Sequence, residues 1–225
     1  MDRLTYSLVE NYMLSYMTDS AHDKEHIYRV LYTALDIAKH EATVDYDILI
    51  CACLLHDIGR TEQFENPSVC HAEAGSEKAY QFLIQNGFDK YFSESVKNCI
   101  LTHRFRQSRQ PESIEAKILF DADKLDVTGA LGIARTLLYK GEVAEPLYSL
   151  TKQGHVSTGE TDHTASFFRE YHYKLKNIYD SFYTRRGAEL AETRRRAAAD
   201  FYNAIFNEVN WAYKNGNSYL EELIK

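Results

Sequence analysis

The sequence predicts an all-α fold, a compact bundle of several helices with a helical extension at the C-terminal end. The three prolines and most of the ten glycines lie between segments in which apolar residues recur at three- and four-residue steps. No segment shows an obvious strand alternation of apolar and polar residues. A hydrophobic share of 44% over 225 residues is enough to form a buried core.

The first strongly amphipathic helix follows Asp23, a residue type that often caps helix N-termini. Its apolar residues fall on one stripe that faces a core. The next apolar run, 48–55, ends at the sequence His56-Asp57-Ile58-Gly59, where the glycine signals a helix stop. Further helices are expected over 72–86, 91–104, 112–139, 165–183 and 187–213.

Residues 150–163 carry glycines, serines and threonines without helical periodicity, and we expect a loop there. The chain therefore divides into two parts. Residues 1–140 form a helical domain that carries the histidine and aspartate motifs considered below. Residues 141–225 form the loop and C-terminal helices that pack on or flank this domain.

The overall charge restricts the partners of the protein. A formal net charge of −7 argues against binding a nucleic acid polymer, whose phosphates repel an acidic surface. The segment 1–16 lacks the features of a signal peptide, and no apolar run is long enough to span a bilayer. We expect a soluble, cytoplasmic protein that does not bind membranes, with its four cysteines reduced because their spacing matches no metal motif.

The pair His56-Asp57 ends a strongly apolar helix, which is an unusual place for two polar side chains. Burying a carboxylate beside an imidazole is costly unless a cation or hydrogen bonds compensate. A metal ion is one interpretation, and a histidine that merely caps the helix end is the other. His26 lies on the preceding amphipathic helix, with Arg29 one turn later on a similar face.

A second acidic group lies within the apolar segment 118–126 and contains Asp121 and Asp123. These two side chains are about 200° apart on an ideal helix, so they do not face the same metal, and spacing alone does not choose between them. Two imidazoles and two carboxylates suit Mn, Fe, Co, Ni or Mg, whereas a structural zinc site would normally use thiolates.

The order of His26, then His56-Asp57, then a distant Asp in Ala-Asp-Lys-Leu resembles the ligand order of the HD-domain superfamily of metal-dependent phosphohydrolases. This resemblance implies Asp123 as the fourth ligand, and Lys124 as a contact to substrate phosphate unless it is an ordinary surface lysine. Segments 121–126 and 129–135 are similar to the small bacterial HD proteins that include nucleotide pyrophosphohydrolases. Residues 1–140 would then be the HD-type catalytic domain.

His71 and His103 fall where binuclear HD enzymes place additional ligands. Three roles remain open for them. With Asp57 bridging, they would hold a second ion. Alternatively, they would act as a general acid and phosphate binders around a single ion, or they would be structural.

The resemblance implies that a divalent ion activates water for attack on the phosphorus of a small substrate. The expected substrate is a nucleotide, with release of pyrophosphate from a nucleoside triphosphate as the specific expectation. Two other classes are an HD-type di-iron oxygenase acting on a small non-phosphate substrate and a binding module without activity. Monomer and homodimer are both left open. Candidate phosphate-binding residues are Arg29, Arg60, Lys124 and Arg135.

Overall fold

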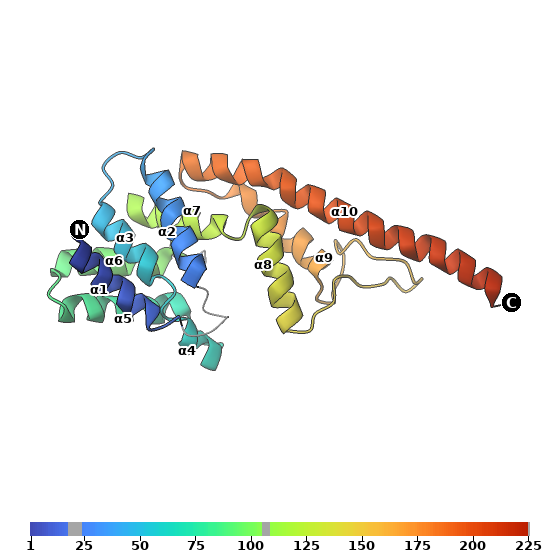
Figure 1. Ribbon diagram of the computed structural model, residues 1–225, viewed down its shortest axis with the longest axis horizontal. Coiled ribbons are helices and arrows are strands. Elements are labelled where there is room, and N and C mark those ends of the chain that lie inside the picture. The colour runs from blue at the N-terminus through green and yellow to red at the C-terminus, as the bar shows by residue number, and fades with distance from the viewer. Residues whose placement is uncertain (18–23, 105–108, 225) are drawn as a thin grey trace. The chain divides into compact units, whose positions relative to one another are not determined.

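The computed structural model describes residues 1–17, 24–104 and 109–224, which form helices joined by turns and loops (Figure 1). The all-α prediction is confirmed, because the described residues contain no strand and only an isolated antiparallel bridge between Leu150 and Val156. Contacts divide the chain into two compact units, one of residues 1–126 with 182–187 and one of 127–181 with 188–225. The functional division at residue 140 stays a prediction, and Asp23 lies outside the described residues.

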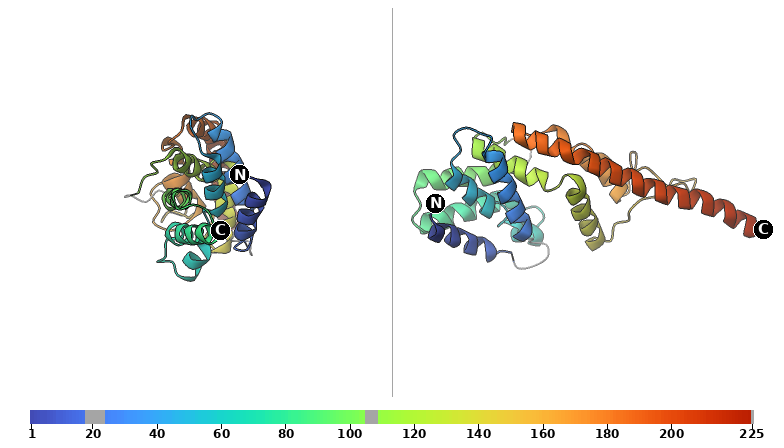
Figure 2. Two further views of the ribbon diagram at one scale, coloured as in Figure 1. Left: turned by 90° about the vertical axis from the view of Figure 1, so that its left-hand side faces the viewer. Right: turned by 45° about the horizontal axis from the view of Figure 1, so that its top comes forward.

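The first unit is a bundle of helices (Figures 1 and 2). Its helices are α1 (Arg3–Leu14), α2 (Lys24–Ala38), α3 (Tyr46–Leu55), α4 (Arg60–Glu65), α5 (His71–Gln85), α6 (Lys90–Thr102) and α7 (Ile114–Leu125). The predicted segments 72–86 and 91–104 correspond closely to α5 and α6. Helix α5 packs on α6 and α2 packs on α7, while α3 contacts α1, α2, α5, α6 and α7.

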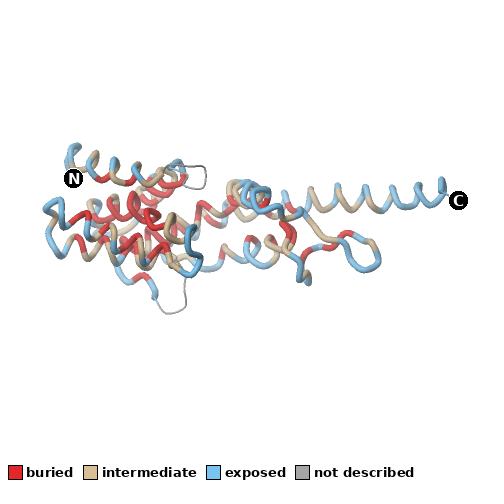
Figure 3. Tube along the Cα trace, turned by 90° about the horizontal axis from the view of Figure 1, so that it is seen from below, coloured by how far each residue is buried: buried red, intermediate tan, exposed pale blue. Residues whose placement is uncertain are grey.

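Helix α3 forms the centre of this core because almost all its residues are apolar. The stretch from Leu49 to Leu55 contains six fully buried side chains, and Figure 3 shows buried residues concentrated in this bundle. The Asp45 side chain caps the helix by accepting from the backbone N–H groups of Asp47 and Ile48. The other end stops at His56, so the chain leaves the core with His56 and Asp57 both buried.

The single helix predicted over 112–139 is wrong, because the chain forms two helices, α7 and α8 (Gly129–Glu142). Thr128 is extended, and Gly129 has a φ of +63°, in the left-handed region that disfavours other residues. A Cβ atom at Gly129 would also approach within 2.8 Å of the Arg194 Cβ. The break between the two helices therefore requires a glycine, both for its backbone conformation and because Arg194, far along the chain, packs against this position.

The second unit contains α8, α9 (Phe167–Glu170) and most of α10 (Arg185–Leu223). The helix predicted over 165–183 is shorter and irregular, since α9 continues as a π-helical turn, Tyr171–Leu175, and a 3-10 turn, Ile178–Asp180. Stacking of Tyr171 on Tyr202, with ring centroids 4.1 Å apart, joins this irregular segment to α10. Helix α10 extends beyond the predicted residue 213, and 150–163 is non-helical as expected.

None of the described helices combines the length and apolar character needed to cross a membrane. All four cysteines are free, as the sequence predicts, and Cys51, Cys53 and Cys99 are buried. They pack as small apolar residues in the first unit.

Candidate metal centre

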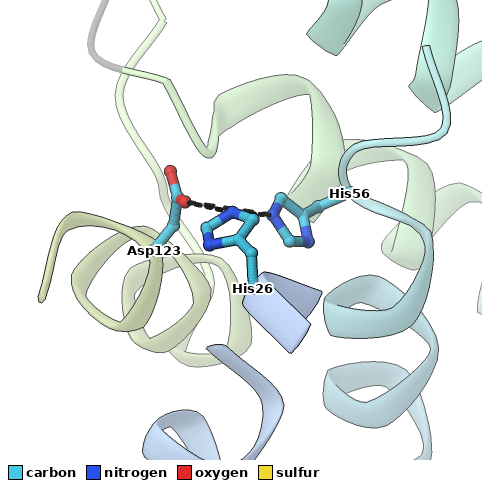
Figure 4. Close-up of side chains that lie close together, drawn as sticks. All are labelled: His26, His56 and Asp123. Atoms are coloured by element: carbon cyan, nitrogen blue, oxygen red, sulfur yellow. Dashed lines mark hydrogen bonds and ion pairs between the residues drawn. The ribbon is translucent and has the colours of Figure 1, made fainter. Parts of the chain in front are cut away.

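Three elements of the first unit bring together His26, His56, Asp57 and Asp123, which we call the first cluster. His26 comes from α2, His56 and Asp57 from the end of α3, and Asp123 from α7; Figure 4 shows His26, His56 and Asp123 facing one another. The His26 Nε2 atom lies 3.3 Å from Asp123 Oδ1 and 3.4 Å from His56 Nε2. It also lies 3.4 Å from Asp57 Oδ2. Residues separated by nearly 100 positions thus converge on one point.

A second cluster, formed by Asp57, His71 and His103, uses the other oxygen of the same aspartate. Asp57 Oδ1 lies 3.4 Å from His71 Nε2 and 3.8 Å from His103 Nε2. The two Nε2 atoms are themselves 3.2 Å apart. His71 begins α5 and His103 follows the last residue of α6, so helix ends supply both rings. Asp57 therefore faces one histidine pair with each of its oxygens.

All four histidines are oriented in the same way. In each ring Nδ1 contacts an oxygen acceptor, so that Nε2 is the nitrogen turned toward the carboxylates. Two of these acceptors, Asp126 and Gln63, are not among the functional residues predicted from the sequence. The pairs are His26 with the Asp126 carboxylate (2.7 Å), His56 with the Cys53 carbonyl (2.7 Å), His71 with Gln63 Oε1 (2.6 Å) and His103 with the Ile100 carbonyl (2.6 Å).

A sequence signal for Asp126 was present, because it lies three residues after Asp123 on the same helical face. Gln63 had no such signal. It lies on the short helix α4, and its distance from His71 depends on how α4 and α5 pack. A glutamine eight residues before a histidine is not a recognisable sequence motif, so the contact between Gln63 and His71 could not be predicted from the sequence.

Burial and charge act in opposite directions on the first cluster. Burial disfavours charge on Asp57, yet Arg60, His56 and His26 hold the pKa of this carboxyl well below its usual range. Burial likewise opposes a charged His26, but hydrogen bonds with Asp123, Asp126 and Asp57 raise its pKa well above the ordinary value. Without a cation, a proton on His26 therefore balances the carboxylates.

The second cluster behaves differently. Burial lowers the pKa of His71 to about 3 and the pKa of His103 to about 4. Both imidazoles are thus neutral near pH 7, which is the form that binds metals. Each side of Asp57 therefore has a distinct electrostatic environment.

Asp121 does not join either cluster. Its carboxylate is fully buried and accepts hydrogen bonds from the backbone N–H groups of Tyr183 and Thr184 and from the Thr184 hydroxyl. Burial raises its pKa, although these donors oppose the shift. Spacing alone did not choose which of the two aspartates faces the metal, but the fold separates them. Asp123 lies beside His26, whereas Asp121 holds the segment 182–187.

The four predicted phosphate-binding residues have different surroundings. Arg60 Nε donates to Asp57 Oδ2 at 2.7 Å, and its side chain remains 39% exposed at the edge of the first cluster. Arg29 Nε donates to Asp126 Oδ1 at 2.8 Å. The Lys124 ammonium lies over the rings of Phe120 and Phe182, and Arg135 belongs to α8 in the second unit. Their roles toward substrate stay predictions.

The donor set suits a divalent cation. In each cluster two imidazole Nε2 atoms face each other at 3.2–3.4 Å beside a carboxylate, an arrangement that a shared cation would stabilise. Asp57 Oδ1 is buried and has no hydrogen-bond partner among the described residues. Such a buried polar atom normally has a partner, and a metal would supply one.

Gly59 fixes the distance between the His-Asp pair and α5. A Cβ atom at this position would overlap the carbonyl oxygen of His71 and the backbone nitrogen of Gly75. Gly59→Ala is therefore expected to lower the free energy of unfolding by about 1–3 kcal/mol, because α5 must move away. Denaturant unfolding measures this change. Displacement of His71 should also lower metal content, measured by elemental analysis.

Gly216→Ala is the matched control, since a Cβ atom there meets nothing within 4 Å. This substitution in α10 should leave stability unchanged or raise it slightly. Equal stability and metal content in the Gly59→Ala and Gly216→Ala proteins would contradict the role given to Gly59.

Comparison with known proteins identifies the family. Residues 24–128 match the family model of the HD domain. A crystal structure of a predicted HD superfamily hydrolase from an uncultured Thermotogales bacterium is 30% identical, with a TM-score of 0.61. The alignment covers 89% of this chain and 90% of that one. The chain belongs to the HD superfamily. As the resemblance implied, this HD protein is a metal-dependent hydrolase that binds a divalent cation.

A further relative is the protein YpgQ of Bacillus subtilis. The protein YpgQ is 29% identical over 207 residues, covering 89% of this HD protein and 92% of YpgQ. A crystal structure of YpgQ in complex with ADP is 25% identical, with a TM-score of 0.70, and covers 91% of this chain and 97% of that one. The similarity thus extends beyond the HD domain into both compact units.

Proposed function

We propose that this HD protein is a phosphohydrolase in which the first and second clusters bind two divalent cations bridged by Asp57. The observation that carries the proposal is the division of the Asp57 carboxylate, with one oxygen toward His26 and His56 and the other toward His71 and His103. When bound, divalent cations lower the pKa of water and polarise a phosphoryl oxygen.

The protein residues hold and orient the reacting groups. The Nδ1 contacts keep the four rings in one orientation, which reduces the reorganisation needed during the reaction. Arg60, half-exposed beside Asp57, is positioned to neutralise a phosphate that approaches the first cluster. The Nε2 atoms of His71 and His103 lie 3.2 Å apart, and that of His71 lies 3.4 Å from Asp57 Oδ1, which supports a ligand role over a general-acid role.

We infer a nucleotide as the substrate, with release of pyrophosphate from a nucleoside triphosphate. Similarity to YpgQ, a protein crystallised with ADP, supports nucleotide binding. The net charge of −7 fits a small substrate held by a few local cations better than a polymer. Arg29, Lys124 and Arg135 remain the other candidates for phosphate contacts.

The test is a product screen with the full-length protein, reloaded after metal removal with Mn²⁺, Mg²⁺, Co²⁺ or Ni²⁺. Nucleoside mono-, di- and triphosphates are incubated separately, and phosphate, pyrophosphate and nucleoside monophosphate are measured in parallel. We expect equal amounts of pyrophosphate and nucleoside monophosphate from a triphosphate. If neither phosphate nor pyrophosphate is released from any nucleotide with any of these metals, the proposal is contradicted. Oxygen consumption by an iron-loaded sample would favour the oxygenase class instead.

A further inference from the structure

The acceptors behind the four metal-facing histidines differ in charge. His26 alone has a carboxylate behind it, from Asp126, whereas the other three rings contact neutral carbonyl or amide oxygens. Asp126 is 4% exposed and is held by Arg29, whose Nε donates to Oδ1 at 2.8 Å and whose Nη2 donates to Oδ2 at 3.1 Å. This geometry fixes the carboxylate against the His26 ring.

The corresponding place behind His71 carries less negative charge. Its acceptor is the neutral amide of Gln63, and the Arg104 Nη1 atom lies 3.3 Å from the same ring nitrogen. Among the described residues, the second cluster contains one carboxylate, that of Asp57, which it shares with the first cluster. The first cluster has Asp123 in addition, with Asp126 behind it.

We propose that the two clusters bind cations with unequal affinity, the first filling before the second, and that Asp126 and Gln63 act as positioning residues that set this difference. The inference rests on the proposed two-cation function. A carboxylate behind an imidazole raises the basicity of the ligand and fixes its ring. Additional negative charge in a buried site also favours a divalent cation.

The consequence is a stepwise dependence on metal concentration. At low free metal the protein holds one cation, on His26, His56, Asp57 and Asp123. The second cation binds at higher concentration to the other oxygen of Asp57. The acceptor at residue 63 thus sets the metal concentration at which the two-cation form appears.

The experiment is a calorimetric titration of the metal-free, full-length protein with Mn²⁺, repeated with Co²⁺ while visible absorption reports the coordination of each ion. The wild-type protein should bind two ions in two resolved steps. Asp126→Asn keeps an oxygen acceptor but removes its charge, and should weaken the first step about 10- to 100-fold. Gln63→Glu supplies the missing charge, and should tighten the second step by a similar factor.

Asp36→Asn serves as the matched control. Asp36 lies on α2, as His26 does, but it belongs to neither cluster. Its Oδ2 atom accepts a hydrogen bond from Arg186 Nε at 2.9 Å. Its replacement should leave both binding steps unchanged. A merely structural role of Asp126 would weaken both steps alike, without changing the Co²⁺ spectrum of the first ion.

Three results would overturn the inference, and they have different meanings. Two ions that bind with equal affinity in the wild-type protein, or no change of the second step in Gln63→Glu, contradict unequal clusters while leaving the two-cation function intact. A stoichiometry of one at saturation contradicts the two-cation function itself, and the inference with it.

Discussion

Replacement of Asp57 by alanine is expected to remove bound metal and to lower kcat/KM for the nucleotide substrate by about 10³-fold or more. Metal ions contribute several kcal/mol to stabilising a phosphoryl transition state, and about 1.4 kcal/mol corresponds to a factor of ten. Asp57 belongs to both clusters, so its loss affects every proposed ligand pair at once. Metal content is measured by elemental analysis and kcat/KM by pyrophosphate release.

Asp57→Asn provides a second, nearly isosteric variant in case the alanine protein folds poorly. Asp47→Asn is the control, because Asp47 lies on the same helix α3 but its half-exposed side chain pairs with the N-terminal amine. A folded Asp57 variant that retains both its metal and its turnover would refute the assignment of the two clusters.

Substitutions of Asp121 and Asp123, two aspartates on α7, should give opposite phenotypes. Asp121→Ala leaves the buried N–H and hydroxyl groups of Thr184, and the partly buried N–H of Tyr183, without their acceptor. Each buried group left without a partner costs about 1–3 kcal/mol. We therefore expect the free energy of unfolding of the metal-free protein to fall by about 3 kcal/mol. Folded Asp121→Ala protein should still bind metal.

Asp123→Asn should instead lose metal at the first cluster and most of its activity. The stability of its metal-free form should change less than that of Asp121→Ala, because among the described residues Asp123 accepts no backbone hydrogen bonds of the kind that Asp121 accepts from Tyr183 and Thr184. Urea unfolding and elemental analysis of both variants measure the two effects. Loss of metal from Asp121→Ala with an unchanged unfolding free energy would reverse the roles of the two residues.

The sequence by itself determined the helical class, the central apolar helix and most of the residues that meet at the candidate metal centre. The run from 48 to 55 is apolar on all sides, so it becomes the buried helix α3 and carries His56 and Asp57 into the interior. Helical periodicity also separated Asp121 from Asp123 onto different faces. These features depend on residues close together in the chain, which sequence patterns describe well.

Only the tertiary structure decided what each of those faces meets. The Asp123 face lies beside His26, while Asp121 holds a segment more than 60 residues away. The contact of His26 with Asp126, the acceptor role of Gln63 and the break before Gly129 likewise depend on packing between elements. Periodicity indicates which side of a helix is apolar. It does not identify the partner of a buried polar atom, because that partner lies on a distant segment and comes within hydrogen-bond reach only when the chain folds.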